Sequence, residues 1–213
     1  DDPAFRQIFE YDQHWSTNAL RVAENALDLA HVSFVHRVTF GEDDNPVAPK
    51  LEMFDVEDGI GIDCEYDVAN RDDQQKNLNI ADDHTHRVMR IQWLMPTVFT
   101  LSIKYPNGLI HQICGFATPI DDRNTHRCQF VFRNDTEADA PAADVAAFDR
   151  RVASEDRRIL ESCGPDYPLD LHEEAHMWMD RPGIEMRKML SEWLSGPPET
   201  RAPAPRAYET AAE

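Results

Sequence analysis

Two histidines and two carboxylates occur at spacings that could support metal chemistry. Asp28, His31 and His36 lie within the stretch ENALDLAHVSFVH, residues 24–36, and Asp156 lies far along the chain. In a regular helix the two rings would point about 140° apart, because each residue turns the helix by about 100°. If His31 and His36 share a task, the helix must bulge or end between them. Otherwise they are two unrelated histidines at a solvated helix end.

The spacing of Asp28 and His31 favours contact between their side chains. Residues three and four positions apart share one helix face, and Glu24 and Val35 fall on that face as well. A carboxylate on the second ring nitrogen is the usual way in which a metal-binding imidazole is oriented. The pair therefore indicates a candidate metal ligand, while a solvated helix end would show the same spacing.

Asp156 interrupts the apolar stripe of a helix that we predict over residues 142–163. The stripe has the three- and four-residue spacing of a core-facing surface. Its apolar members are Val145, Phe148, Val152, Ile159 and Cys163. Glu155 flanks Asp156 and is expected to point elsewhere. A buried carboxylate needs a partner, because an unpaired one is costly or changes its pKa.

The partner of Asp156 could be a cation, a buried Arg or a metal, and a core Asp bridged to an Arg or a backbone amide remains open. Combined with His31 and His36, Asp156 completes a 2-His-1-carboxylate set. That set is typical of non-haem iron(II) oxygenases and leaves open positions for oxygen. The three residues are therefore candidate iron ligands.

The composition limits the possible classes of protein. The 213 residues are 41% hydrophobic, which suits one globular domain with a sizeable core. The net charge of −19 argues against nucleic acid and anionic membrane surfaces as partners. Four separated cysteines without a CxxC pair predict buried thiols in a reducing, cytoplasmic type of compartment. We find no apolar run long enough for a membrane span and no signal peptide.

The secondary-structure elements that the sequence predicts around these residues belong to the α+β class. A helix over 16–36, capped by Ser16 or Thr17, precedes a loop over 40–49. A hairpin at Asp58-Gly59 opens an antiparallel meander of about six strands. Residues 70–84 are polar, and we predict that they are irregular. We also predict a helix over 183–194, after the one at 142–163. We expect one curved antiparallel sheet packed on the long helix near the C-terminus, and a disordered Pro- and Ala-rich tail over 196–213.

The stretch NALRVAENALDLAHVSFVH resembles Rieske-type non-haem iron oxygenases, the aromatic ring-hydroxylating enzymes, and above all their vanillate O-demethylase and pheophorbide a oxygenase-like members. The family pattern N-x-x-D-x-x-H-x-x-x-x-H falls on Asn25, Asp28, His31 and His36. The family's carboxylate ligand follows a Glu in an E-D pair, which in SEDRRILES is Asp156. Further likeness in GFATPIDDRNTHRCQFVFRND and DRPGIEMRKML extends the resemblance over about residues 1–194.

The resemblance implies a helix-grip, START-like catalytic domain over residues 1–195. Mononuclear iron(II) bound by His31, His36 and Asp156 would activate O2 to hydroxylate or oxidatively demethylate an aromatic or related hydrophobic substrate. Asp28 would hold an iron histidine and link it to the 2Fe-2S cluster of a neighbouring subunit in a homotrimer. Electrons would come from NAD(P)H through a reductase or ferredoxin. Asn25 would border the substrate pocket.

The chain departs from the family because it lacks the motif that binds the 2Fe-2S cluster, C-x-H followed by C-x-x-H. No cysteine in this sequence has a histidine two or three residues later. The N-terminal Rieske domain is therefore absent from the chain, which also lacks an initiator methionine. We expect the catalytic domain of a longer protein, able to bind iron but inactive alone; a stand-alone relative with another electron source is the alternative.

Two other classes compete with the oxygenase. The segment LHEEAHMW contains His172, Glu173 and His176, the H-E-x-x-H pattern of zinc hydrolases. No histidine follows His176 to serve as a third ligand, and the short interval between two prolines favours a solvated acidic face that binds no metal. The second alternative is a non-catalytic helix-grip module that binds a hydrophobic ligand. The substrate itself cannot be read from the sequence.

Overall fold

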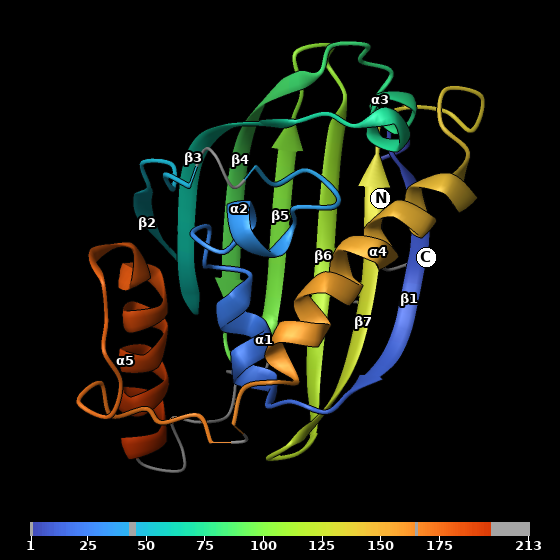
Figure 1. Cartoon of the computed structure of the whole chain (residues 1–213). Helices are drawn as coiled ribbons and strands as arrows, with labels where there is room; N and C mark the ends of the chain where they lie inside the picture. The colour runs from blue at the N-terminus through green and yellow to red at the C-terminus, as the bar shows by residue number, and fades with distance from the viewer. Residues whose placement is uncertain (1, 43–45, 165, 197–213) are drawn as a thin grey trace, which may run out of the picture.

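A seven-stranded antiparallel sheet forms the centre of the computed structural model, which describes residues 2–42, 46–164 and 166–196 (Figure 1). The strand order is β1-β7-β6-β5-β4-β3-β2, so the chain from β2 to β7 is an uninterrupted meander and β1 closes the sheet beside β7. The strands are β1 Arg6–Trp15, β2 Glu52–Val56, β3 Gly59–Ala69, β4 His84–Leu94, β5 Val98–Lys104, β6 Ile110–Asp121 and β7 Asn124–Arg133.

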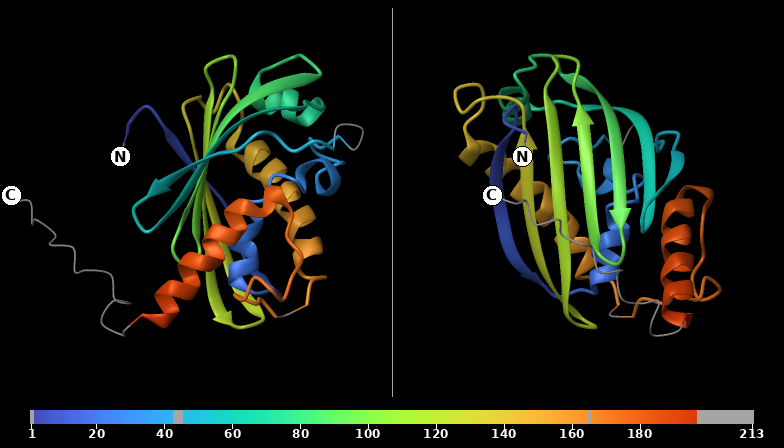
Figure 2. Two further views of the ribbon diagram at one scale, coloured as in Figure 1. Left: turned by 90° about the vertical axis from the view of Figure 1, so that its left-hand side faces the viewer. Right: turned by 180° about the vertical axis from the view of Figure 1, so that it is seen from behind.

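Helices cover one face of this sheet. They are α1 Ala19–Asn25, α2 Val32–Val35, α3 Asp72–Leu78, α4 Ala142–Leu160, the 3-10 turn η1 Trp178–Asp180 and α5 Arg181–Ser195. The long helix α4 crosses the face diagonally with α1 beside it, and α5 stands near the β3 edge (Figures 1 and 2). The predicted α+β class, with a curved antiparallel sheet on a long helix, is confirmed.

Strand β1 was not predicted and raises the expected count of about six strands to seven. Its pairing with β7 shifts between Phe9 and Tyr11, so Glu10 is an extra residue in a β-bulge. Glu10 and Tyr11 are consequently both buried, although they are adjacent. The bulge breaks the period-two pattern on which strand prediction relies.

The helix predicted over 16–36 is interrupted, which corrects that expectation. Helix α1 is capped by Asn18, whose side chain accepts from Leu20 N–H, rather than by Ser16 or Thr17. It ends at Asn25, before the histidines. A turn in which Asp28 Oδ1 accepts the Ala30 N–H at 2.7 Å leads into the short helix α2. This side-chain bond offers the backbone an alternative to the helical one.

Two further helices differ from the prediction. Residues 70–84, expected to be irregular, contain α3, whose single apolar residue Leu78 provides no helical periodicity. Helix α4 ends at Leu160 rather than at 163, and Ile159 and Cys163 are exposed instead of continuing the stripe. Of the four free cysteines only Cys64 is buried. The tail predicted beyond Gly196 lies outside the described residues.

The predicted hairpin at Asp58-Gly59 joins β2 to β3. Asp58 adopts a positive φ of 58°, as tight turns require. A Cβ on Gly59 would lie 1.9 Å from the carbonyl oxygen of Trp93, so glycine is needed where β3 begins beside β4. In the register of β3 and β4, Gly59 is opposite Leu94, and Ile62 is opposite Ile91 in the core.

The apolar core lies between the sheet and the helices. Its most completely buried side chains come from β3, β4, the turn after α1, and α5: Ile62, Ile91, Trp93, Leu27, Met186 and Leu190. The helices of the described chain offer no segment with the length and apolar character needed to cross a membrane.

Candidate metal centre

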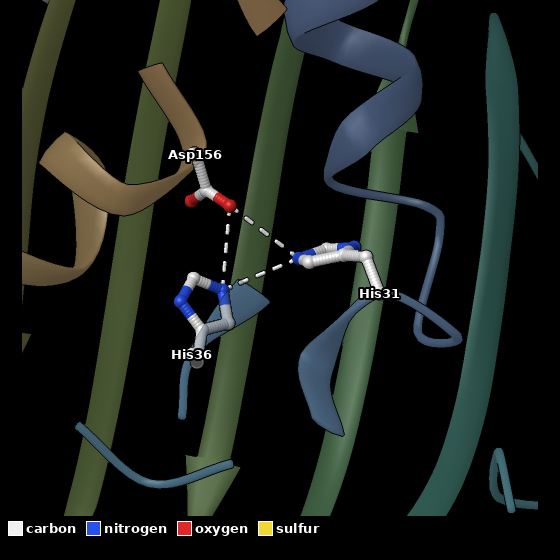
Figure 3. A group of neighbouring side chains, drawn as sticks. All are labelled: His31, His36 and Asp156. Atoms are coloured by element: carbon white, nitrogen blue, oxygen red, sulfur yellow. Dashed lines mark hydrogen bonds and ion pairs between the residues drawn. The ribbon is translucent and has the colours of Figure 1, made fainter. Parts of the chain in front are cut away.

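Three side chains from two regions of the chain converge beneath the sheet (Figure 3). His31 is the residue before α2, His36 is the residue after it, and Asp156 lies on α4. Because α2 is only four residues long, the two histidines flank a single helical turn and their rings face each other at 5.1 Å between centroids. The rings therefore converge although they are five residues apart.

The atoms that converge are one nitrogen or oxygen from each residue. His31 Nε2 lies 3.2 Å from His36 Nε2. Asp156 Oδ1 lies 3.4 Å from the first nitrogen and 3.3 Å from the second. Ligand atoms held about 2.0–2.2 Å from one ion and on one side of it are about 3 Å apart. The triangle therefore has the dimensions of a metal-binding face.

The outer nitrogen of each imidazole contacts another carboxylate. His36 Nδ1 lies 2.9 Å from Glu155 Oε2, and His31 Nδ1 lies 3.3 Å from Asp28 Oδ2. If each Nδ1 carries the hydrogen and donates it outward, both Nε2 atoms present lone pairs to the centre. Asp156 Oδ1 is buried and accepts no hydrogen bond from the described residues. Three lone pairs then face one point with no hydrogen between them, an arrangement that suits a cation.

The pKa values follow from the same contacts. Burial alone would lower the pKa of His36, but its contacts with the charged carboxylates of Asp156 and Glu155 raise it to about 9. Burial alone would raise the pKa of Asp156, but His36, the charge of His31 and a hydrogen bond from Asn25 lower it. The pKa of Asp28 is lowered because the His31 contacts outweigh its burial. The carboxylates are thus ionised, as ligands and their supporting groups must be.

Glu155 corrects one expectation from the sequence. It points toward the site rather than elsewhere, and Thr39 Oγ1 donates to the same Oε2 atom at 2.8 Å. On a helix, neighbouring residues diverge by about 100°, yet Glu155 and Asp156 hold opposite nitrogens of the same His36 ring. The sequence signal for this role is the adjacency of two acids in SEDRR.

A cavity of about 180 Å³ opens beside the three ligands. Its walls are largely apolar, with contributions from Trp15, Phe99, Leu101 and Ile103. Asn25, at the end of α1, lines it. Asp28 lies at the boundary between this cavity and an outer cleft, because it lines both. A small, mostly hydrophobic molecule would therefore meet the three converging atoms.

The H-E-x-x-H segment does not form the helix that a zinc hydrolase requires. Residues 171–174 form a turn, and His172 and Glu173 are exposed. His176 lines the outer cleft, to which His31 and Asp156 also contribute. Among the described residues, the groups whose ligand atoms converge contain neither His172 nor His176.

Comparison with known proteins agrees with the geometry. A family model described as vanillate O-demethylase oxygenase C-terminal domain matches residues 15–196. No curated protein matches the chain.

Solved structures with the same fold have sequences that are less than 25% identical to this chain. NdmA of Pseudomonas putida CBB5 with caffeine is 24% identical, with a TM-score of 0.70, over 91% of this chain and 53% of that one. NdmB of the same organism is 22% identical, with a TM-score of 0.67, over 90% and 52%. Dicamba monooxygenase bound to 3,6-dichlorosalicylic acid is 18% identical, with a TM-score of 0.69, over 92% and 62%. The chain thus spans about half the length of NdmA and NdmB.

Proposed function

The chain belongs to the family of the vanillate O-demethylase oxygenase C-terminal domain, the catalytic domain of Rieske-type non-haem iron oxygenases, and from this membership we propose its reaction. It uses mononuclear iron(II) and O2 to hydroxylate or oxidatively demethylate an aromatic or related hydrophobic substrate. The observation that carries the proposal is the convergence of His31 Nε2, His36 Nε2 and Asp156 Oδ1 at the wall of an apolar cavity. These three atoms are the proposed iron ligands.

Bound iron(II) supplies the activation of O2, and the chain supplies geometry and a dry cavity. Glu155 accepts the Nδ1–H of His36 and is itself held by Thr39, so the ring cannot rotate away from the centre. Asp28 does the same for His31 from the opposite side. Asn25 donates to Asp156 and keeps that carboxylate turned inward. Such outer contacts fix the tautomer and orientation of metal ligands.

The substrate class rests on the cavity. Its aromatic and aliphatic walls favour a small ring compound, held with one edge toward the iron ligands. Several solved structures of the same fold contain caffeine, theobromine, dicamba or 3,6-dichlorosalicylic acid, all of which are small ring compounds. We extend to this chain only the coarse class, an aromatic or heteroaromatic molecule.

The electron supply must come from outside the described residues. We propose a Rieske domain with a 2Fe-2S cluster, reduced by NAD(P)H through a reductase or ferredoxin, that reaches the iron at Asp28. The side chain of Asp28 is 40% exposed, the most exposed of the groups around the two histidines, and it lines the outer cleft. A homotrimer, in which a neighbouring subunit presents the cluster, is part of this proposal. Alone, the chain should bind iron without turning over.

Metal analysis of single variants tests the proposal. The chain is reconstituted with iron(II) without oxygen, freed of excess metal, and its iron and zinc are measured for the wild type, His31→Ala and His172→Ala. We expect His31→Ala to bind one iron per chain fewer than the wild type, and His172→Ala to bind as much iron as the wild type. Zinc lost only from His172→Ala would favour the hydrolase instead. Absence of metal from all three proteins would leave a hydrophobic-ligand module.

A further inference from the structure

A second group of metal-ligand atoms lies apart from the iron ligands. Glu10 reaches it from β1, His111 from β6 and Asp149 from α4, and one ligand atom from each lies within 4.8 Å of the others. His111 Nε2 is 3.2 Å from Asp149 Oδ2. The family pattern in the sequence does not include these residues, and neither the alternation of β6 nor the stripe of α4 singles them out.

All three side chains are buried and each has an unused polar atom. Glu10, His111 and Asp149 are 1%, 5% and 9% exposed. Glu10 Oε1, His111 Nε2 and Asp149 Oδ2 have no hydrogen-bond partner in the described chain. Buried polar atoms without partners cost free energy, so three of them at one point require an occupant.

The backbone and its neighbours direct Glu10 to this point. The β-bulge in β1 turns Glu10 to the inner face beside Tyr11, as bulges commonly re-aim a side chain. Gln129 Nε2 donates to Glu10 Oε2 at 2.7 Å, and Tyr11 O–H donates to Gln129 Oε1 at 2.9 Å. Glu10 Oε2 is thereby held, which leaves Oε1 for the group. Outer contacts of this kind are typical of metal ligands.

The charges of the Glu10 and Asp149 carboxylates favour a group that holds a cation over an empty one. Two buried carboxylates this close to each other repel unless a proton or a cation lies between them. The two buried arginines nearby are engaged elsewhere, Arg133 by Asp135 and the carbonyl oxygen of Asn77, and Arg127 by Gln129 and the carbonyl oxygen of Cys128. The group therefore holds either a proton shared by the two carboxylates or a metal ion.

We propose that Glu10, His111 and Asp149 bind a divalent transition-metal ion at a site separate from the iron centre. One imidazole nitrogen and carboxylate oxygens form a donor set suited to Zn²⁺, Mn²⁺ or Fe²⁺. Asp149 precedes Asp156 by two turns of α4, about 10 Å along the helix axis, so the two ions do not form a bridged pair, which needs about 4 Å. The second ion ties β1 and β6 to α4 across the cavity that His111 and Asp149 line.

Zinc is the probe, and a double variant removes the first site. The full chain carrying His31→Ala and His36→Ala is freed of metal, dialysed against Zn²⁺ and measured for zinc per chain, beside the wild type. We expect two zinc ions in the wild type and one in the double variant. Adding Glu10→Gln should abolish the remaining ion, whereas adding His126→Ala, an exposed histidine paired with Asp12, should leave it.

Several results would overturn the second site. One zinc ion per chain in the wild type and none in the double variant would mean that Glu10, His111 and Asp149 share a proton and bind no metal. Zinc that survives Glu10→Gln, or that falls with His126→Ala, is surface-bound. If Glu10→Gln fails to fold, Co²⁺ in the double variant replaces it: visible bands indicating nitrogen and oxygen donors support the site, and the spectrum of aqueous Co²⁺ contradicts it. The iron proposal is unaffected by any of these outcomes, because it depends on His31.

Discussion

Glu155 shows how single atoms define the candidate centre. Its carboxylate binds the Nδ1 side of His36 while Asp156 faces the Nε2 side, so one imidazole is held between two acids. The side chain of His36 is only 4% exposed, and that of Glu155 15%. In such a setting the removal of one hydrogen bond changes how the ring is presented to a metal.

Glu155→Gln should weaken iron binding without unfolding the chain. Glutamine keeps an oxygen that can accept the Nδ1–H of His36 but loses the charge, so the ring is held less firmly. We expect iron affinity to fall about 10- to 100-fold, as for other contacts behind metal ligands. Competition with a chelator of known affinity measures it. Glu161→Gln, at the exposed end of the same helix, is the matched control and should bind iron normally.

Asp28→Asn should separate iron binding from electron supply. The amide oxygen can still accept the Ala30 N–H in the turn, so the backbone should be preserved. The amide nitrogen then faces His31 Nδ1, so iron(II) is supplied in excess to keep the site filled. In the protein completed by its Rieske domain, we expect the rate at which the cluster reoxidises to fall about 10- to 100-fold. Rapid-mixing spectroscopy of the cluster follows that rate. A normal rate would show that electrons do not pass through Asp28.

At the scale of elements, the short helix α2 brings the two histidines together. One helical turn separates them, and the chain is anchored immediately afterwards: Gly41 N–H donates to the carbonyl oxygen of His36 at 2.7 Å. A Cβ at Gly41 would lie 2.4 Å from the carbonyl oxygen of Val32 and 2.9 Å from the carbonyl carbon of His36. Both neighbours are backbone atoms of this small unit, so a side chain there must displace it.

Gly41→Ala should therefore damage the iron site through the backbone. The clash pushes His36 away from His31 and Asp156, and we expect a loss of about 1–3 kcal/mol of stability together with weaker iron binding. Chemical denaturation and iron titration measure the two effects. Gly164→Ala, where an added Cβ meets no atom within 4 Å, is the control. Normal iron binding by Gly41→Ala would contradict the role given to this anchor.

For the whole molecule, one ion-pair network holds the C-terminal helix to the domain. The side chain of Arg187, on α5, is 3% exposed and makes two hydrogen bonds to the Glu24 carboxylate of α1 at 2.8 and 2.9 Å. Its other nitrogen contacts Glu174 at 2.7 Å. Glu24 thus turns to α5 rather than to the iron site, although the sequence placed it on the same helix face as His31. The last helix is fastened to α1, which leads into the metal-binding turn.

Arg187→Ala should destabilise the protein strongly. It leaves the partly buried Glu24 carboxylate without its cation, while Glu174 keeps only its longer contact with Arg21, and breaking such a buried pair costs about 3–5 kcal/mol. Urea denaturation followed by circular dichroism measures the loss. Lys188→Ala removes an exposed pair with Glu185 and should cost no more than about 1 kcal/mol. Equal losses in the two variants would show that the network does not anchor α5.

Local patterns in the sequence were informative wherever the structure is regular. The hairpin turn, the strands from β2 to β7 and the helices α4 and α5 follow from periodicity and turn residues. Strand β1 did not, because its bulge breaks the alternation, and the helix predicted over 16–36 failed because a single side-chain bond at Asp28 redirects the backbone. These two failures lie at residues to which we assign chemical roles, where local rules are expected to give way to the requirements of a site.

Sequence patterns are enough to identify the chemical groups and the partners that they require: two histidines, an acid within an apolar stripe, and the family pattern that contains them. Which atoms meet depends on the tertiary structure. The approach of His31 to His36, the inward turn of Glu155, and the grouping of Glu10, His111 and Asp149 each depend on backbone irregularities and on contacts between elements far apart in the chain. Spacing along a chain specifies direction only within one regular element, whereas a site assembled from several elements is set by how those elements pack.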